Sequence, residues 1–332
     1  MAIHPRLMLP FEDGTVTLPE GGTFAIFNAH GIYPDLPKDD ITCLQGFYPS
    51  HIGLQNAGYV VTTHPPSAAD TAIVHITRSK DETRALVAQA FEILPVGGQL
   101  LIDGSKTDGI ESLLKESKKR TSVHGQISKA HGKIFWLSKD SNVNPFAEWA
   151  SATQPKKNAD GWHTSAGVFS SDGIDPGSAE LVPTFAKSLK GKIADRGAGW
   201  GWLAAQALET CPAIDQLDLI EAEHAALVCA RLNVTDPRAT FHWTDATKPT
   251  TKNSYDAIIM NPPFHVGRKA DPSLGRAFIH SAATLLKPTG QMFLVANRQL
   301  AYEATLDTCF NRWEVLSQTP RYKIIHARKP KL

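Results

Sequence analysis

Short apolar strands alternate with helical segments through the second half of the chain, and this alternation restricts the fold more than any other feature. Strands are expected, in chain order, at residues 192–195, 216–221, 240–243, 255–260, 291–296, 313–318 and 322–327. Helices are expected at residues 202–208, 223–233 and 274–286. Strands joined by crossover helices lie parallel, whereas only three residues separate the last two strands, which fits an antiparallel hairpin. The pattern predicts an α/β fold with a Rossmann-like, mostly parallel seven-stranded sheet that ends in an antiparallel C-terminal hairpin.

The first half of the chain contains an echo of the second. Residues 84–102 align without a gap with residues 276–294, and both stretches have a helical segment, a glycine turn and an apolar strand. A chain of 332 residues suits two domains of about 150 residues each. Residues 140–160 are weakly apolar and rich in Asn, Ser, Pro and Lys, as expected of a linker. We therefore predict duplicated domains at 1–150 and 151–332, although any helix–turn–strand unit would align to some extent.

A glycine-rich turn follows the first strand of the second domain. It reads Asp195-Arg196-Gly197-Ala198-Gly199-Trp200-Gly201, and its glycines allow close approach of the backbone to a ligand. The spacing differs from the Gly-x-Gly-x-x-Gly of dinucleotide sites, which disfavours a nicotinamide cofactor. Glu221 ends the next strand and can accept hydrogen bonds from both hydroxyls of a ribose. Asp245 follows the third strand, where it can either accept from an adenine amino group or cap a turn.

The tetrapeptide Asn261-Pro262-Pro263-Phe264 ends the fourth strand in the same crevice. Two prolines cannot continue a sheet, because neither offers an N–H, so a plain strand terminator is one interpretation. The other is catalytic, since the Asn261 side-chain oxygen and the Pro262 carbonyl can both accept from one planar NH2 group. Such acceptors would turn the nitrogen lone pair toward a methyl donor, so that catalysis consists mostly of alignment. Phe264 would stack on the planar substrate.

These motifs resemble those of class I methyltransferases that act on planar NH2 groups. The closer resemblance is to the two-domain ribosomal RNA guanine-N2 methyltransferases, whose best-known members modify the small ribosomal subunit. The motifs that carry it are Gly167-Val168-Phe169-Ser170, Asp175-x-Gly177-Ser178, Asn261-Pro262-Pro263-Phe264-His265 and Arg321-Tyr322-Lys323-Ile324. The resemblance is strong over about 160–330 and only architectural over 1–150. Ala198 stands where the family commonly has Cys, and Arg196 replaces a usual apolar residue, for which the sequence offers no explanation.

The resemblance implies that S-adenosylmethionine is the cofactor and ribosomal RNA, or a ribosomal subunit, the substrate. It implies a catalytic role for Asn261, Pro262, Pro263 and Phe264. It implies cofactor contacts from Phe169, Asp195, Gly197, Ala198, Gly199, Gly201, Glu221, Asp245, Ala246 and Asn261. Substrate contacts are expected from Phe264, His265, Arg268, Lys269, Arg321 and Lys323. For His265 a capping or supporting role is favoured over acid–base work. For Arg268 and Lys269 a plain solvated surface is the alternative to contact with phosphate. The first domain would be a degenerate copy that recognises RNA or supports the second.

Cysteine spacing and the N-terminal sequence argue against a metal- or redox-active cysteine protein and against a secreted one. The formal net charge is only +1, although residues 151–332 carry an excess of bases that gathers after Glu314. Such a tail either binds a polyanion or is a solvated end. The four cysteines have neither metal-ligand nor redox spacing, and the N-terminus lacks the apolar core of a signal peptide. We expect a cytoplasmic monomer that uses no metal and no membrane.

Three alternatives remain open from the sequence. The same NH2 chemistry serves a guanine of large-subunit ribosomal RNA. It also serves N6-adenine and protein-glutamine methyltransferases, which the Asn-Pro-Pro-aromatic motif alone does not separate from guanine enzymes. A non-enzymatic RNA-binding or assembly protein with two inactive halves is the third, and the intact Asn261 motif argues against it.

Overall fold

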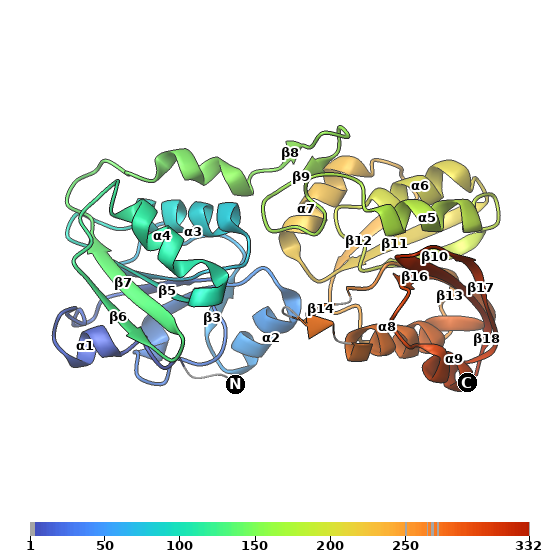
Figure 1. The fold of residues 1–332 in the computed structure, drawn as a ribbon, viewed down its shortest axis with the longest axis horizontal. Coiled ribbons are helices and arrows are strands. Elements are labelled where there is room, and N and C mark those ends of the chain that lie inside the picture. The colour runs from blue at the N-terminus through green and yellow to red at the C-terminus, as the bar shows by residue number, and fades with distance from the viewer. Residues whose placement is uncertain (1–3, 250, 264, 267–268, 271, 332) are drawn as a thin grey trace. The chain divides into compact units, whose positions relative to one another are not determined.

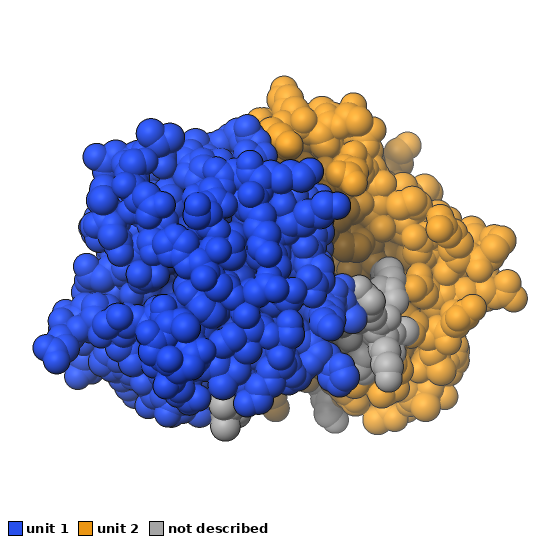
Figure 2. Space-filling view, turned by 60° about the vertical axis from the view of Figure 1, so that its left-hand side comes forward, with its two compact units in different colours: residues 1–155, 165–167 blue, residues 156–164, 168–332 orange. Residues whose placement is uncertain are grey.

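The computed structural model describes residues 4–331 except 250, 264, 267, 268 and 271, and it leaves the side chains of 265, 266, 269 and 270 undescribed. The chain divides into two compact units (Figure 2). Unit 1 comprises 1–155 and 165–167, and unit 2 comprises 156–164 and 168–332. Among the described residues, none of the helices combines the length and apolar character needed to cross a bilayer.

Each unit contains a seven-stranded sheet flanked by helices (Figure 1). In spatial order, the strands of unit 1 are β3 (Val60–Thr62), β2 (Ile41–Leu44), β1 (Phe24–Phe27), β4 (Thr71–His75), β5 (Gln99–Ser105), β7 (Gly132–Ser138) and β6 (Gly125–Lys129). Those of unit 2 are β12 (Ala239–Trp243), β11 (Ile214–Glu221), β10 (Gly191–Arg196), β13 (Tyr255–Met260), β16 (Leu286–Asn297), β18 (Tyr322–Pro330) and β17 (Phe310–Gln318). In both sheets the first five strands pair in parallel, and the sixth strand, β7 or β18, is antiparallel to the strands on both of its sides. The predicted duplicated α/β architecture is confirmed.

Helices cover both faces of each sheet. In unit 1 they are α1 (Leu9–Glu12), α2 (Tyr48–Asn56), α3 (Lys80–Glu92) and α4 (Ile110–Ser117), with 3-10 helices η1 (Lys38–Asp40), η2 (Lys106–Asp108) and η3 (Ala147–Thr153). In unit 2 they are α5 (Pro176–Phe185), α6 (Trp202–Thr210), α7 (His224–Asn233), α8 (Pro272–Leu285) and α9 (Glu303–Cys309). Two short hairpins, β8 (Lys156–Lys157) with β9 (His163–Thr164) and β14 (His265–Val266) with β15 (Lys269–Ala270), complete the described elements.

The central strands are apolar on both faces because each face is packed. Ala257 and Ile259 of β13 lie in the same apolar cluster as Leu203 of α6, whereas Ile258 and Met260 join the cluster of α8 on the opposite face. Alternate residues of a strand point to opposite faces, so a sheet buried on both sides gives a continuous apolar run. This is why 255–260 could be recognised as a strand from its sequence.

The internal echo falls on equivalent elements. Residues 84–102 span most of α3 and the start of β5, and residues 276–294 span α8 and most of β16. β5 and β16 occupy the same position in the two sheet orders.

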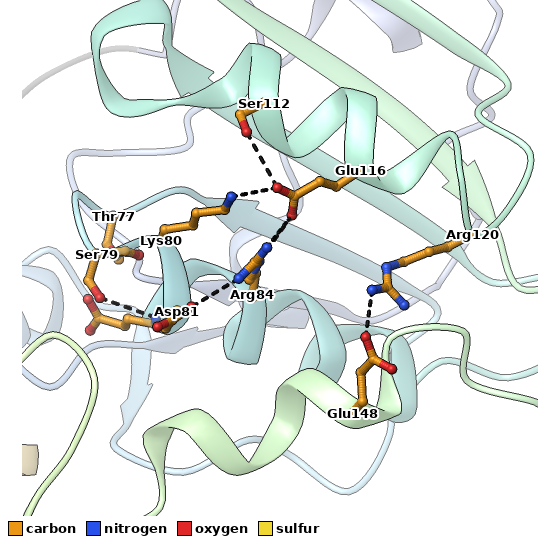
Figure 3. A network of polar contacts seen from close by, with 10 residues as sticks. Thr77, Ser79, Lys80, Asp81, Arg84, Ser112, Glu116, Arg120 and Glu148 are labelled. Carbon is orange, nitrogen blue, oxygen red and sulfur yellow. Dashed lines mark hydrogen bonds and ion pairs between the residues drawn. The ribbon is translucent and has the colours of Figure 1, made fainter. Parts of the chain in front are cut away.

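A network of ion pairs and hydrogen bonds in unit 1 joins α3 to α4, and an ion pair joins Arg120 to η3 (Figure 3). Glu116 of α4 accepts from Lys80 at 2.6 Å and from Arg84 at 2.8 Å, both on α3. Arg120 pairs with Glu148 of η3 at 2.5 Å and lies over the Trp149 ring, 4.6 Å from its centroid. Trp149 is buried in the core, so η3 belongs to the fold of unit 1 although the sequence indicated a linker there.

Candidate functional site

Unit 2 has a pocket at the carboxyl ends of β10 and β13. These two strands are neighbours. After β10 the chain continues to β11 on one side, and after β13 it continues to β16 on the other side. Doubly wound sheets bind ligands at the point where the strand order reverses in this way. The pocket is lined by Phe169, Ser170, Asp175, Ser178, Asp195, Gly197, Ala198, Gly199, Trp200, Trp202, Leu203 and Asn261. It therefore brings together the predicted glycine-rich turn, the strand-end Asn261 and Phe169, which lie far apart in the sequence.

The glycine-rich turn needs glycine for two different reasons. Gly197, Gly199 and Gly201 all have positive φ, of 76°, 55° and 89°. A Cβ on Gly201 would lie 2.9 Å from Val234 Cγ2, so this glycine lets the turn pack against the residue that follows α7. A Cβ on Gly199 would meet nothing within 4 Å, so the backbone there is open on the pocket side. The turn thus presents bare backbone to whatever fills the pocket.

Glu221 holds this turn in place. Its Oε2 accepts from the Gly199 N–H at 2.8 Å, and its Oε1 accepts from the Glu223 N–H at 2.7 Å. Burial raises the pKa of Glu221, and these backbone donors oppose that shift. Each carboxylate oxygen can accept a further hydrogen bond. The residue therefore fixes the turn and keeps acceptor capacity for a ligand.

Asp195 is a buried carboxyl that lines the pocket. It is 1 % exposed, and among the described residues neither of its oxygens has a hydrogen-bond partner. Burial, together with the nearby charge of Glu221, raises the pKa of Asp195 to about 8. Because an unpaired buried polar group is costly, such an atom usually marks a missing ligand or water. The site fits a ligand that brings a cationic or hydrogen-donating group to Asp195.

The amide of Asn261 is held from one side. Its Nδ2 donates to Asp175 Oδ2 at 2.7 Å and to Ser178 Oγ at 2.9 Å. The same Oδ2 accepts from the Ser178 N–H at 2.8 Å and thereby caps the N-terminus of α5. Two acceptors on the amide nitrogen determine which end of the amide is oxygen, so Oδ1 remains for another donor.

Asp175 and Ser178 are missing from the predicted set of site residues, although both were part of the motif that carried the resemblance. The local signal for α5 was present, because Asp175-Pro176 is a capping residue followed by proline at the first helical position. No rule of sequence spacing connects that cap to Asn261, which lies 86 residues further along the chain.

Arg196, which the sequence left unexplained, is a buried cation that joins two segments. It is 1 % exposed, and its Nη2 donates to the Ala246 carbonyl and to Ser281 Oγ of α8, the latter at 2.7 Å. Burial lowers the pKa of Arg196 only to about 10, so the guanidinium stays charged near neutral pH. Arg196 therefore fixes the backbone just after Asp245, where the cofactor's adenine was expected.

Asp245 caps a turn. Its Oδ1 accepts from the Thr247 N–H at 2.9 Å and from Thr247 Oγ1 at 2.6 Å. Its Oδ2 lies 3.7 Å from the exposed Lys248 amino group. Ala246, the next residue, is buried. The structure thus shows the turn-capping alternative for Oδ1. A contact with adenine would have to use Oδ2.

The remaining predicted residues lie elsewhere or outside the described part of the chain. Pro262 is buried and Pro263 exposed, and β13 ends at Met260 just before them. Phe264 and Arg268 lie outside the described residues, and for His265 and Lys269 only the backbone pairing of β14 with β15 is described. Arg321 is exposed. Lys323 is buried, and its amino group lies 2.6 Å from Glu303 Oε1, so it does not offer a free cation to phosphate.

Comparison with known proteins assigns both halves. Residues 161–326 match the model of the methyltransferase small domain, and residues 48–152 match that of its N-terminal domain. A Yersinia pseudotuberculosis protein named ribosomal RNA small subunit methyltransferase C is 30 % identical over 281 residues, which are 81 % of this chain and 78 % of that protein. Its Yersinia enterocolitica counterpart is 29 % identical over 296 residues with the same coverage.

A solved structure shares the fold over most of the chain. It is a T. thermophilus 16S rRNA N2 methyltransferase in complex with AdoMet and guanosine. It has a TM-score of 0.78 at 23 % sequence identity, over 94 % of this chain and 90 % of that one.

Proposed function

Since the chain belongs to the methyltransferase small-domain family, we propose that it transfers a methyl group from S-adenosylmethionine to the exocyclic N2 amine of a guanine in small-subunit ribosomal RNA. Relatives named as small-subunit ribosomal RNA methyltransferases support the substrate class. The observation that carries the proposal is the Asn261 amide, which is held by its nitrogen so that its oxygen is left to accept from a substrate amine.

The residues of the pocket fit S-adenosylmethionine. Asp195 would face the ammonium of the methionine part, because its buried carboxyl has no other partner among the described residues. The bare backbone of the turn at 197–199 leaves room for the same part of the cofactor. Glu221 would accept from the ribose hydroxyls, and Asp245 with Ala246 would border the adenine. Phe169 lines the pocket and would cover the methionine end.

The reaction needs alignment more than acid–base catalysis. The sulfonium of the cofactor supplies an electrophilic methyl group and a good leaving group. Asn261 Oδ1 and the Pro262 carbonyl would accept from the two hydrogens of the guanine amine, which directs the nitrogen lone pair toward the methyl group. Once methylated, the nitrogen is cationic and loses its proton readily. Phe264 would stack on the base.

The proposal also assigns residues that contact RNA and a role for unit 1. Arg321, Arg268 and Lys269 are proposed to meet RNA phosphates, whereas Lys323 is left out because of its partner Glu303. Unit 1 lacks a counterpart of the glycine-rich turn and would recognise RNA shape or support unit 2. We also propose that the protein acts in the cytoplasm, where ribosomal subunits are available, and that it is a monomer.

The proposal is tested with the whole protein and small ribosomal subunits from cells that lack it. Incubation with methyl-labelled S-adenosylmethionine, followed by nuclease digestion and mass spectrometry of the nucleosides, should yield labelled N2-methylguanosine. Large subunits and a recombinant translation factor serve as competing substrates. Label in N6-methyladenosine, in protein or predominantly in large-subunit RNA would overturn the substrate assignment, and absence of any label would overturn the activity.

Replacing Arg196 with methionine should weaken cofactor binding more than it slows the methyl transfer step. The Ala246 carbonyl and Ser281 hydroxyl would lose a charged donor, at a cost of about 1–3 kcal/mol each if they stay unsatisfied. Removal of the buried charge offsets part of that cost. Calorimetry should show about a 10-fold rise in the Kd of S-adenosylmethionine, a factor that corresponds to about 1.4 kcal/mol. Arg312→Met, at an exposed position of β17, is the matched control, and equal affinities in the two variants would contradict the role of Arg196.

A further inference from the structure

Three histidines of unit 1 lie together although they are far apart in the sequence. His4 precedes α1, His30 follows β1, and His75 ends β4. Their ring centroids are 4.3 Å apart for His4 and His75, 4.7 Å for His30 and His75, and 4.9 Å for His4 and His30. One ring nitrogen from each lies within 4.8 Å of the other two.

The innermost histidine has no hydrogen bonds to explain its burial. His75 is 2 % exposed, and among the described residues neither Nδ1 nor Nε2 has a hydrogen-bond partner. Nδ1 lies 3.4 Å from Asp103 Oδ2, at ion-pair distance. A buried ring nitrogen without any partner is costly, so Nε2 of His75 points to a group that the described protein atoms do not provide.

Each of the three rings has one nitrogen next to an oxygen acceptor and one left over. His30 Nδ1 lies 3.0 Å from the Asn28 carbonyl, and His4 Nε2 lies 2.6 Å from the His30 carbonyl. His75 Nδ1 faces Asp103. Metal-bound histidines commonly donate their second N–H to a carbonyl or carboxylate, which fixes the tautomer and turns the other nitrogen's lone pair to the metal. In this cluster the leftover atoms are His4 Nδ1, His30 Nε2 and His75 Nε2.

We propose that His4, His30 and His75 bind one divalent transition-metal ion, with zinc the best match, through these three nitrogens and with a fourth position open to water. Imidazole nitrogen suits zinc, and a tetrahedral site with bonds of about 2.0–2.1 Å places its donor nitrogens about 3.4 Å apart. One nitrogen of each ring lies within 4.8 Å of the other two, so the nitrogens must approach one another to reach that geometry. The His4 and His75 rings are stacked, with 21° between their planes, so one of these rings must also rotate before both lone pairs point at the ion.

The electrostatic surroundings suit a cation. The nearby cation, Arg6, is paired with Asp103, with Nε 2.7 Å from Oδ1 and Nη2 3.2 Å from Oδ2. Its charge is therefore balanced next to the site.

The proposed site lies at strand ends of unit 1 that are equivalent to those forming the pocket of unit 2. His30 follows β1 and His75 ends β4, and these strands correspond in sheet order to β10 and β13, whose ends form the pocket of unit 2. Unit 1 thus keeps a candidate binding site at the strand ends where unit 2 has its pocket. The sequence-based expectation of no metal rested on cysteine spacing, which carries no information about histidines 26 and 45 residues apart in three separate segments.

The test uses the full-length protein without an oligohistidine tag, because such a tag binds the same ions. Zinc chloride is titrated in competition with a chromophoric chelator, and cobalt chloride is used to read the coordination geometry from the visible absorption of Co²⁺. Wild-type protein should bind one equivalent of Zn²⁺, melt at a higher temperature with it, and give the intense bands of tetrahedral Co²⁺. Mg²⁺, which prefers oxygen ligands, should have no effect.

Three variants decide the outcome. His30→Ala removes a ligand at an exposed position and should lower zinc affinity at least 100-fold while the protein keeps its melting temperature in the absence of metal. His75→Ala should do the same, and His30→Ala still decides if that buried substitution prevents folding. His64→Ala, at an exposed position of the same unit, should bind like the wild type. No zinc uptake by the wild type, or equal uptake by wild type and His30→Ala, would overturn the proposal without touching the proposed methyl transfer.

Discussion

Replacing Asn261 with alanine is expected to slow methyl transfer to small-subunit ribosomal RNA by about 100-fold or more while the Kd of S-adenosylmethionine changes only a few-fold. The Nδ2 of Asn261 donates to Asp175 and Ser178, so the proposed alignment of the substrate amine falls to the amide oxygen. That contact matters only when the amine is positioned for attack, and its loss should therefore appear in the rate of the chemical step.

Single-turnover methylation under saturating cofactor measures that step directly, and calorimetry measures cofactor binding separately. Ser178→Ala is the matched control, because it removes one of the two contacts to the Asn261 nitrogen and leaves Asp175 in place. We expect a loss of about 10-fold or less there, in line with one hydrogen bond of about 0.5–1.5 kcal/mol. Turnover at the wild-type rate by Asn261→Ala would rule out the alignment role.

Glu221→Ala should raise the Kd of S-adenosylmethionine by about 10- to 100-fold, the equivalent of roughly 1.5–3 kcal/mol for a charged hydrogen-bonding group. Two losses combine in this variant. The proposed contact with the ribose hydroxyls disappears, and the N–H of Gly199 loses the acceptor that holds the turn. Binding of ribosomal RNA should change much less, because the residues proposed to contact RNA do not include Glu221.

Isothermal titration with cofactor and a filter-binding assay with small subunits separate these two affinities. Glu209→Ala, an exposed carboxylate on α6, is the control for removal of a negative charge from the same unit. An unchanged cofactor affinity in Glu221→Ala, with the variant folded, would exclude Glu221 from the binding site.

Features that one strand or turn encodes locally could be predicted from the sequence. Strand 255–260 was recognisable because it is buried on both faces, and the glycine-rich turn because it needs positive φ at Gly197, Gly199 and Gly201. The duplicated sheet was also predictable, since its repeat carries the same helix–turn–strand unit. The resemblance to a family added the chemistry.

Features that arise from packing between distant segments could not be predicted. Arg196 appeared as an unexplained charge at a strand end, because its partners Ala246 and Ser281 are 50 and 85 residues away. The hydrogen bond from Asn261 to Asp175 depends on where the start of α5 lies relative to the end of β13. The helix α9 and the early start of β16 at Leu286 were missed as well, because apolar spacing alone places the ends of elements poorly.

The proposed contact of the buried Asp195 carboxyl with the ammonium of S-adenosylmethionine would make cofactor binding a proton-coupled event. With a pKa near 8, this group holds a proton in the free protein at neutral pH, and a cationic ligand beside it favours the ionised form. Binding should therefore expel the proton, and affinity should rise with pH until it levels off above about 8. The heat of binding measured at pH 7 will then vary with the ionisation enthalpy of the buffer, a dependence that Asp195→Asn should abolish.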